Sequence, residues 1–326
     1  MTVENITIRD PHSGTTARVL TGLGSNLYSL CVPIGDREVD LLWAAEDFGR
    51  GTERPSGSGI PIPFPFPGRI AGNAREMRKT GPPAGTGFEW EEKSYALEAG
   101  DAFGNAIHGF VYNRPWRVTA QTESSLTTQF QASVDDATIL ERWPADFKIT
   151  MVYELHDRTL ELRCTVENPD SRPLPFGLGF HPYFRLPLLG GHADECTVSL
   201  PVSRRWELRD MLPTGEISAV TNAADLQSGI AFRDMRFDDV FTGLIGRDGK
   251  CAAVIHEPST GTRVDLAFDS QFRECVVYTP GHRGAVCVEP YTCVPNAINL
   301  QPTKDTGLRV LERGGVFATW LRIRVV

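Results

Sequence analysis

The 326-residue sequence lacks the marks of several protein classes. Its seven cysteines are an odd number and none are spaced C-x-x-C, which disfavours a disulfide framework and a structural zinc site. No stretch approaches the ~20 apolar residues of a membrane helix, and the N-terminal segment has no basic start followed by an apolar run, as a secretory signal would. A phosphate loop, a zinc-binding histidine pair and a nucleophile elbow are also missing. We therefore expect a cytoplasmic protein with free thiols that binds no membrane and uses no metal or cofactor.

An excess of basic residues is absent as well. Lysine and arginine number 33 against 41 acidic residues, a net charge of −8, which disfavours a nucleic-acid partner because such proteins usually carry a basic face. The apolar share of 41% and the charged share of 23% are ordinary for a globular protein. Composition says nothing positive about the substrate and does not distinguish a monomer from a homodimer.

Alternation of apolar and polar residues is the recurrent pattern. It runs through residues 147–155 and again through residues 159–167, and the polar turn between them completes a predicted hairpin with one buried face. Residues 263–268 and 317–326 show the same period of two. These segments predict antiparallel β-strands.

Helical periodicity is weak, apart from a turn or two at Ala137–Trp143 and at Ala223–Gln227. The 31 glycines and 23 prolines are spread along the chain and divide it into many short segments. Residues 77–87 are a predicted exposed loop. Because no repeat or linker interrupts the pattern, we expect a single all-β domain over residues 1–326, built as a large antiparallel β-sandwich.

Two segments place a basic side chain beside prolines or a glycine. In Pro61–Ile70 the prolines prevent regular strand pairing and keep the chain extended, which can direct Arg69 inward. Its planar set of donors suits adjacent hydroxyls or a carboxylate. In the second segment, Gly104–Phe110, the glycine at position 109 leaves room for a ligand beside His108. For Arg69 the alternative is an exposed surface arginine, and for His108 it is a structural histidine. Each segment taken alone favours its alternative over a binding role.

Two further segments place a titratable group in apolar surroundings. His181 lies in the run Pro175–Phe184, and histidine can donate or accept a proton near neutral pH. Glu289 ends the apolar run Ala285–Val288, which predicts a buried strand, and burial would raise the pKa of Glu289 and make it a better base. A hydrogen-bonded core histidine and a glutamate at the exposed end of a strand are the alternatives.

A weaker signal is the acidic pair Asp238-Asp239, which has apolar neighbours on both sides. Either carboxylate could accept hydrogen bonds from ligand hydroxyls, but composition alone favours a turn. None of these segments is specific by itself.

Taken in order and with their spacing, the segments resemble the aldose 1-epimerase (galactose mutarotase) family over roughly residues 19–326. The strongest matches are Asn105–Gly109, Gly179–Phe184, Val288–Pro290 and Pro295–Asn299. The resemblance implies a β-supersandwich with the sugar lying across a concave sheet.

The resemblance also implies the activity, which is interconversion of the α and β anomers of a free aldose, a hexose such as galactose or glucose. His181 would be the general acid and Glu289 the general base. Arg69, His108 and Asp238 would hold the sugar hydroxyls, with Asp239 competing for the last position. A carboxylate and an imidazolium on opposite sides of the C1–O5 bond are sufficient for this chemistry. Ionised Glu289 and protonated His181 would start the reaction, which predicts a bell-shaped pH–rate profile.

Two departures from the family pattern concern specificity. Many relatives carry asparagine where this chain has Gly68, so a contact is expected to be lost or moved. Residues 77–93 lack the family's usual sequence, which is expected to reshape the rim of the site.

Three other functions remain open at this point. The fold also occurs as a non-catalytic carbohydrate-binding module. A hexose-6-phosphate 1-epimerase would need a basic cluster, for which Arg75, Arg78 and Lys79 are candidates. A glycoside hydrolase would need two carboxylates beside the bond, which Glu289 and Asp238 could imitate.

Overall fold

The computed structural model describes residues 4–51, 54–71, 86–300 and 304–326. β-strands dominate these residues, so the predicted all-β class is confirmed. The α-helices are α1 (Ala132–Asp135), α2 (Ala223–Ser228) and α3 (Ala297–Leu300), and short 3₁₀ turns lie at Phe48–Arg50, Val111–Asn113, Ala137–Glu141, Ala193–Glu195 and Phe232–Asp234. None of the helices in the described ranges has the length and apolar character that crossing a bilayer would require.

The largest sheet has nine strands in the order β18-β15-β20-β21-β25-β12-β11-β10-β9. Their bounds are β9 Arg117–Gln121, β10 Ser125–Gln131, β11 Lys148–His156, β12 Thr159–Glu167, β15 Thr197–Ser199, β18 Ile230–Ala231, β20 Lys250–Glu257, β21 Thr262–Asp269 and β25 Val316–Val325. Every pairing in this sheet is antiparallel.

Two further sheets form the second layer. The four-stranded sheet holds β1 (Asn5–Arg9), β2 (Thr16–Leu20), β3 (Asn26–Ile34) and β4 (Arg37–Asp40). The six-stranded sheet has the order β14-β23-β22-β19-β16-β17, with β14 Tyr183–Arg185, β16 Arg204–Arg209, β17 Leu212–Ala219, β19 Asp238–Thr242, β22 Glu274–Tyr278 and β23 Ala285–Tyr291. A bridge between Leu42 and Phe184 joins the two sheets edge to edge.

Short two-stranded pairs complete the architecture. They are β5 (Arg69–Ile70) with β8 (Ala106–Ile107), β6 (Thr86–Trp90) with β7 (Lys93–Leu97), and β13 (Leu174–Phe176) with β24 (Arg309–Leu311).

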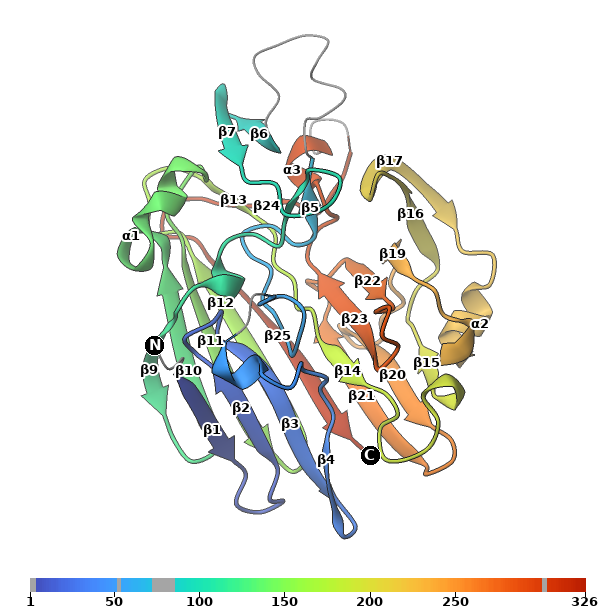
Figure 1. The fold of residues 1–326 in the computed structure, drawn as a ribbon. Helices are drawn as coiled ribbons and strands as arrows, with labels where there is room; N and C mark the ends of the chain where they lie inside the picture. The colour runs from blue at the N-terminus through green and yellow to red at the C-terminus, as the bar shows by residue number, and fades with distance from the viewer. Residues whose placement is uncertain (1–3, 52–53, 72–85, 301–303) are drawn as a thin grey trace.

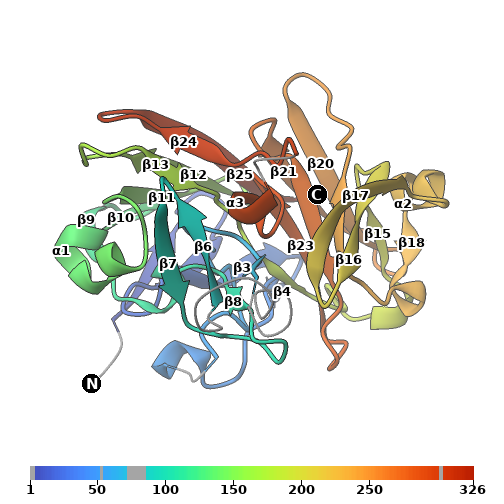
Figure 2. The same cartoon turned by 90° about the horizontal axis from the view of Figure 1, so that it is seen from above.

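The two layers pack face to face around one apolar core. In Figures 1 and 2 the four- and six-stranded sheets lie on the same side of the nine-stranded sheet. One buried cluster contains Val32 of β3, Met151 of β11 and Val277 of β22, and so joins all three sheets. This is the sandwich predicted from the alternation; the extent of the domain, residues 1–326, stays a prediction.

The predicted hairpin is confirmed residue by residue. Strands β11 and β12 pair along their whole length, and every second residue of each is buried. Asp157 and Arg158 connect them at positive φ, as a two-residue turn between twisted strands requires. The other two predicted strands are β21 and β25, which pair with each other.

The weak helical signals are also present, as the 3₁₀ turn at Ala137–Glu141 and as α2. The predicted exposed loop at residues 77–87 needs correction at its end. Residues 77–85 lie outside the described residues, but Gly87 is buried within β6, where it pairs with Ala96 of β7. Burial alternates at the end of β7, but in β6 the consecutive residues Gly87 and Phe88 are both buried, unlike the regular pattern of β11 and β12.

Candidate active site

A cavity of about 440 Å³ lies over the six-stranded sheet. All five residues predicted for the site line it, namely Arg69, His108, His181, Asp238 and Glu289. A second hollow of about 560 Å³ lies on the nine-stranded sheet, where Glu161 accepts hydrogen bonds from Arg163 and Arg322. The charged side chains of this hollow are exposed to water and largely pair with one another. The cavity of about 440 Å³ is therefore the candidate site.

Strand register brings polar groups together on the cavity floor. Directly opposite residues of an antiparallel pair point to the same face of the sheet. Cys287 of β23 lies opposite Tyr278 of β22, which lies opposite Asp238 of β19. The neighbouring row holds Glu289 and Val276. Asp239 belongs to the alternate face and does not line the cavity, so Asp238 is the acid that the structure places there.

The proline-rich segment holds His181 in place. Its prolines cannot donate hydrogen bonds, but their carbonyl oxygens still accept. At distances of 2.7–3.1 Å, the amides of Gly177, Gly179, His181 and Tyr183 donate to the carbonyls of Pro65, Pro63, Pro61 and Gly59, in that order. The pairing that the prolines were expected to prevent is therefore present on one side. The imidazole is further fixed by stacking on Tyr183, with ring centroids 4.7 Å apart.

A second backbone arrangement presents Arg69 and His108 side by side. Strands β5 and β8 pair, and the amide of His108 donates to the carbonyl of Gly68. His108 has a φ of 63°, an uncommon conformation that a residue other than glycine adopts at some cost and that often marks a functional position. The amide of Asn296 donates to the carbonyl of Arg69, which gives a structural role to the Pro295–Asn299 motif.

The departure at Gly68 has a steric reason. This glycine has a φ of 64°, and a Cβ added there would lie 2.7 Å from Cγ of Pro295. A side chain at this position would require the backbone or Pro295 to move. The two loops therefore pack closely at Gly68, and the expected loss or movement of a sugar contact stays a prediction.

Two acids flank the Arg69 side chain. Its Nε donates to Oδ2 of Asp101 at 2.9 Å, and its Nη2 lies 3.7 Å from Oδ2 of Asp238. Asp101 is held in turn by the amides of Phe103 and Asn105. The guanidinium is therefore aimed into the cavity by fixed partners.

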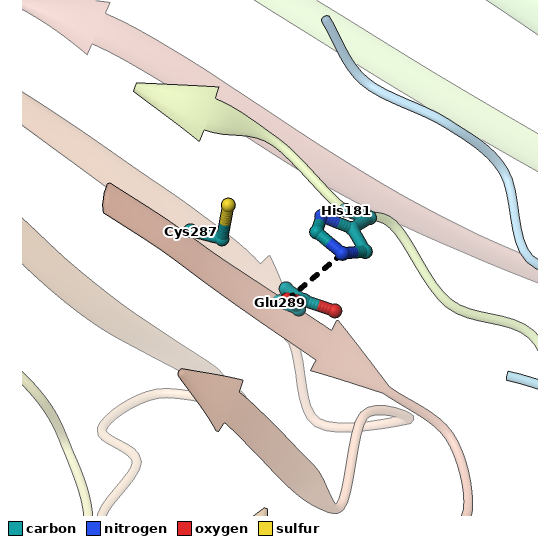
Figure 3. Close-up of side chains that lie close together, drawn as sticks. All are labelled: His181, Cys287 and Glu289. Carbon is teal, nitrogen blue, oxygen red and sulfur yellow. Dashed lines mark ion pairs between the residues drawn. The ribbon is translucent and has the colours of Figure 1, made fainter. Parts of the chain in front are cut away.

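His181 and Glu289 form a buried pair. Nε2 of His181 lies 3.2 Å from Oε1 of Glu289, and the residues are 5% and 1% exposed. Figure 3 shows the imidazole facing the carboxylate across the gap between β23 and the segment that leads into β14. The other oxygen, Oε2, accepts a hydrogen bond of 2.5 Å from the hydroxyl of Tyr291.

Burial shifts the pKa values of this pair toward the neutral forms. It lowers the pKa of His181 to about 3, with a smaller contribution from the positive charge of Arg69. It raises the pKa of Glu289 well above the usual carboxyl range, although the Tyr291 hydrogen bond opposes that rise. The expected starting form, ionised Glu289 with protonated His181, is therefore not the favoured one in this structure. Both forms contain the same number of protons and differ only in which of the two groups carries the shared one.

Several polar atoms of the site lack partners. Within the described part of the chain, Nδ1 of His108, Nδ1 of His181 and Oε1 of Glu289 are buried without a hydrogen bond. Buried polar atoms are normally satisfied, and exceptions concentrate where a ligand or water binds. The arrangement suits a ligand that carries several hydroxyl groups.

His181, Cys287 and Glu289 are also the residues that could hold a metal ion, since their ligand atoms lie within 4.8 Å of one another (Figure 3). A bound metal would require the thiolate of Cys287. Burial and the nearby carboxyls of Glu289 and Asp238 raise the pKa of this thiol well above its usual value. The surroundings of the sulfur therefore favour the protonated thiol, which is a poor metal ligand.

Two functional contacts were missed in the sequence. Tyr291 follows Glu289 by two residues, so the period of a strand could have placed both side chains on one face. Asp101 carries no such signal, because its link to Arg69 spans 32 positions and depends on the fold.

Comparisons with known proteins agree with the family resemblance and the fold. The sequence model described as "aldose 1-epimerase" matches residues 4–324. Among curated proteins, the uncharacterized protein YphB of Escherichia coli K12 is 22% identical over 134 residues, which is 41% of this chain and 41% of that relative. The aligned part thus spans about two fifths of the relative's length.

Solved structures share the whole architecture. A galactose mutarotase-like protein from Clostridium acetobutylicum has a TM-score of 0.83 at 24% identity, covering 98% of this chain and 95% of that one. An aldose epimerase homologue from C. elegans has a TM-score of 0.78 at 17% identity, covering 99% and 98%. A galactose 1-epimerase from Lactobacillus acidophilus has a TM-score of 0.71 at 15% identity, covering 100% and 99%.

At these identities the structural likeness establishes the fold, which is the predicted galactose mutarotase-like sandwich. The family match extends over nearly the whole sequence and confirms the resemblance carried by the motifs around His108, His181 and Glu289. The chain belongs to the aldose 1-epimerase family.

Proposed function

We propose that this protein interconverts the α and β anomers of a free aldose by opening and reclosing the sugar ring. The observation that carries the proposal is the buried pair of His181 and Glu289, 3.2 Å apart at the floor of a polar cavity. An acid and a base held together in this way can move protons on a substrate without any further group.

The chemistry needs two proton transfers. Ionised Glu289 accepts the proton of the C1 hydroxyl while protonated His181 donates to the ring oxygen, so that the C1–O5 bond breaks and a C1 carbonyl forms. Rotation about the C1–C2 bond presents the other carbonyl face. Reclosure returns both protons and leaves the pair as it began. General acids and bases each typically contribute about 10²–10⁴-fold.

The remaining cavity residues would orient the sugar. Arg69 and Asp238 offer donors and an acceptor to hydroxyl groups, and His108 adds an unpartnered nitrogen within the described residues. Sugar hydroxyls would satisfy the orphaned atoms of the site. The hydrogen bonds formed on binding would offset the free-energy cost of burying those atoms without a partner.

The direct test is polarimetry at neutral pH. We expect the protein to accelerate the change in optical rotation of freshly dissolved α-D-glucose or α-D-galactose. His181→Ala and Glu289→Gln should both abolish the acceleration. Absence of acceleration with every free aldose tested, from a folded protein, would contradict the proposal.

A silent carbohydrate-binding module is the main alternative, and sugar binding measured by calorimetry distinguishes it. Glu289→Gln should still bind sugar while losing turnover, because the amide preserves shape but cannot act as a base. A wild-type protein that binds sugar without any acceleration would instead support the module.

The charges of the cavity favour a neutral sugar over a phosphorylated one. Among the described residues, the arginines that line it are Arg54 and Arg69, and no lysine does. Asp101 and Asp238 flank Arg69, so its charge is already opposed before a ligand binds. The proposed cluster of Arg75, Arg78 and Lys79 lies outside the described residues. Turnover of glucose 6-phosphate faster than glucose would favour the phosphosugar epimerase, and release of nitrophenol from nitrophenyl glycosides would favour the hydrolase.

A further inference from the structure

Tyr291 contacts the carboxylate that the proposed reaction needs as its base. Its hydroxyl donates to Oε2 of Glu289 at 2.5 Å, and both residues are 1% exposed. The opposite oxygen, Oε1, faces His181 and has no hydrogen bond to any residue that the structure describes. The two carboxylate oxygens thus have different surroundings.

We propose that Tyr291 is a positioning residue, which fixes the Glu289 carboxylate so that Oε1 alone serves as the proton acceptor in anomer interconversion. The inference rests on the proposed function. A carboxylate with two equivalent oxygens could rotate about its last bond and turn the reacting oxygen away from the sugar. The hydrogen bond to Oε2 removes this freedom before the substrate arrives.

The tyrosine ring is enclosed, so its hydroxyl has a defined position. A Cβ added to Gly179 would lie 2.5 Å from Cδ1 of Tyr291, and one added to Gly68 would lie 3.5 Å from its Cε2. The backbone is pinned as well, because Gly179 forms a bridge to Tyr291 and the carbonyl of Tyr291 accepts from the amide of Arg273. The glycine that precedes Phe180-His181 therefore makes room for the tyrosine that holds Glu289.

The same hydrogen bond affects the charge of the carboxyl group. A donor stabilises the ionised form, and therefore lowers the pKa that burial raises. The other titratable or charged groups around Glu289 are His181, Tyr183, Cys275, Cys287, Tyr278, Asp238 and Arg69. Asp238 opposes ionisation of Glu289 and Arg69 favours it. Within the described residues, Tyr291 is the group that donates a hydrogen bond to this carboxylate.

The test is Tyr291→Phe, which removes the hydroxyl and keeps the ring. We expect kcat to fall by about tenfold or more, with KM within about twofold, because the lost interaction acts on the reacting group. The pH limb set by Glu289 should move up by about 1–2 units, the size expected for a lost hydrogen bond to a charged group. Tyr28→Phe is the matched control, since it removes a hydroxyl hydrogen bond to Asn5 away from the cavity.

A second variant should shift the pKa of Glu289 in the opposite direction. Placing 3-fluorotyrosine at position 291 makes the hydroxyl a stronger donor, so the pKa of Glu289 should fall instead of rising. A uniform loss of rate at every pH in Tyr291→Phe, or shifts of the same sign in the two variants, would overturn the inference.

The titration of Glu289 can also be followed without turnover, by NMR of ¹³C-labelled glutamate. The signal absent from Glu289→Gln identifies the residue. An upward pKa shift in Tyr291→Phe from a wild-type protein that accelerates no sugar would refute the proposed function and, with it, the role of Tyr291 in catalysis. An unchanged pKa from an active wild type would refute the inference alone.

Discussion

Asp101 accepts a hydrogen bond from Nε of Arg69 at 2.9 Å, which orients an arginine that reaches the cavity from another part of the chain. Asp101 is held by backbone amides, so it is a rigid support for the guanidinium. We expect this contact to serve binding more than proton transfer, because among the described residues neither side chain forms a hydrogen bond or ion pair with His181 or Glu289.

Asp101→Asn should therefore raise KM by about tenfold and leave kcat nearly unchanged, since a charge-assisted hydrogen bond is worth about 1–3 kcal/mol. Steady-state polarimetry separates the two constants. Asp47→Asn is the control: it alters an exposed ion pair with Arg50 and should change neither. A loss confined to kcat in Asp101→Asn would assign this residue a different role.

The pH dependence of kcat should be bell-shaped, because the active pair holds one proton. On the acid side the pair gains a second proton, and burial places the lowered pKa of His181 at about 3. On the alkaline side the pair loses its proton at the raised pKa of Glu289. Rates corrected for the spontaneous reaction, measured from about pH 3 to about pH 10 while the protein stays folded, would show both trends. An acid limb centred at the ordinary histidine value of 6.5 would contradict the pairing.

Gly179→Ala tests the space reserved for the Tyr291 ring. The new Cβ would lie 2.5 Å from that ring, so we expect a loss of about 1–3 kcal/mol in the free energy of unfolding, together with reduced kcat. Denaturant unfolding and polarimetry on the same preparation measure both. Gly281→Ala, whose Cβ would meet no atom within 4 Å, should leave both unchanged.

The buried carboxyl of Glu274 should make stability depend on pH. It accepts a hydrogen bond from Nε1 of Trp206 at 3.0 Å, and burial raises its pKa from 4.5 to about 7. The folded state then binds this proton more tightly than the unfolded state does. The stabilisation is complete below about pH 4.5 and is lost as the pH rises through about 7.

Glu274→Gln removes this titration. As the pH rises from about 4.5 to about 8, the free energy of unfolding of the variant should increase by about 3 kcal/mol relative to that of the wild type. Urea unfolding of both proteins at these two pH values gives the difference directly. Parallel pH dependence of the two proteins would show that Glu274 does not titrate as inferred.

The sheet strands could be predicted because burial repeats every second residue, as in β11 and β12, and this period is written in the local sequence. Glu289 could be placed on a buried strand for a different reason, because it follows the continuous apolar run Ala285–Val288. The fold supplied what local sequence does not contain. Pairing of β19 with β22 selects Asp238 over Asp239, and pairing of β5 with β8 brings Arg69 beside His108.

The protonation of the His181–Glu289 pair is a second property that residue types do not determine. In water at neutral pH a glutamate is ionised and a histidine is partly protonated, but both neutral forms are favoured here because both groups are buried. Depth of burial depends on the loops around the cavity. It therefore follows from tertiary structure and not from a motif.

Strand β25 lies between β21 and β12, in the middle of the nine-stranded sheet, although it follows all the other described strands in sequence. During synthesis the chain emerges from its N-terminal end, so two separate parts of this sheet leave the ribosome first, β9–β12 and the set of β15, β18, β20 and β21. Each part exposes an unpaired edge until residues 316–325 follow. Shortening β25 would leave both edges open to association with other chains.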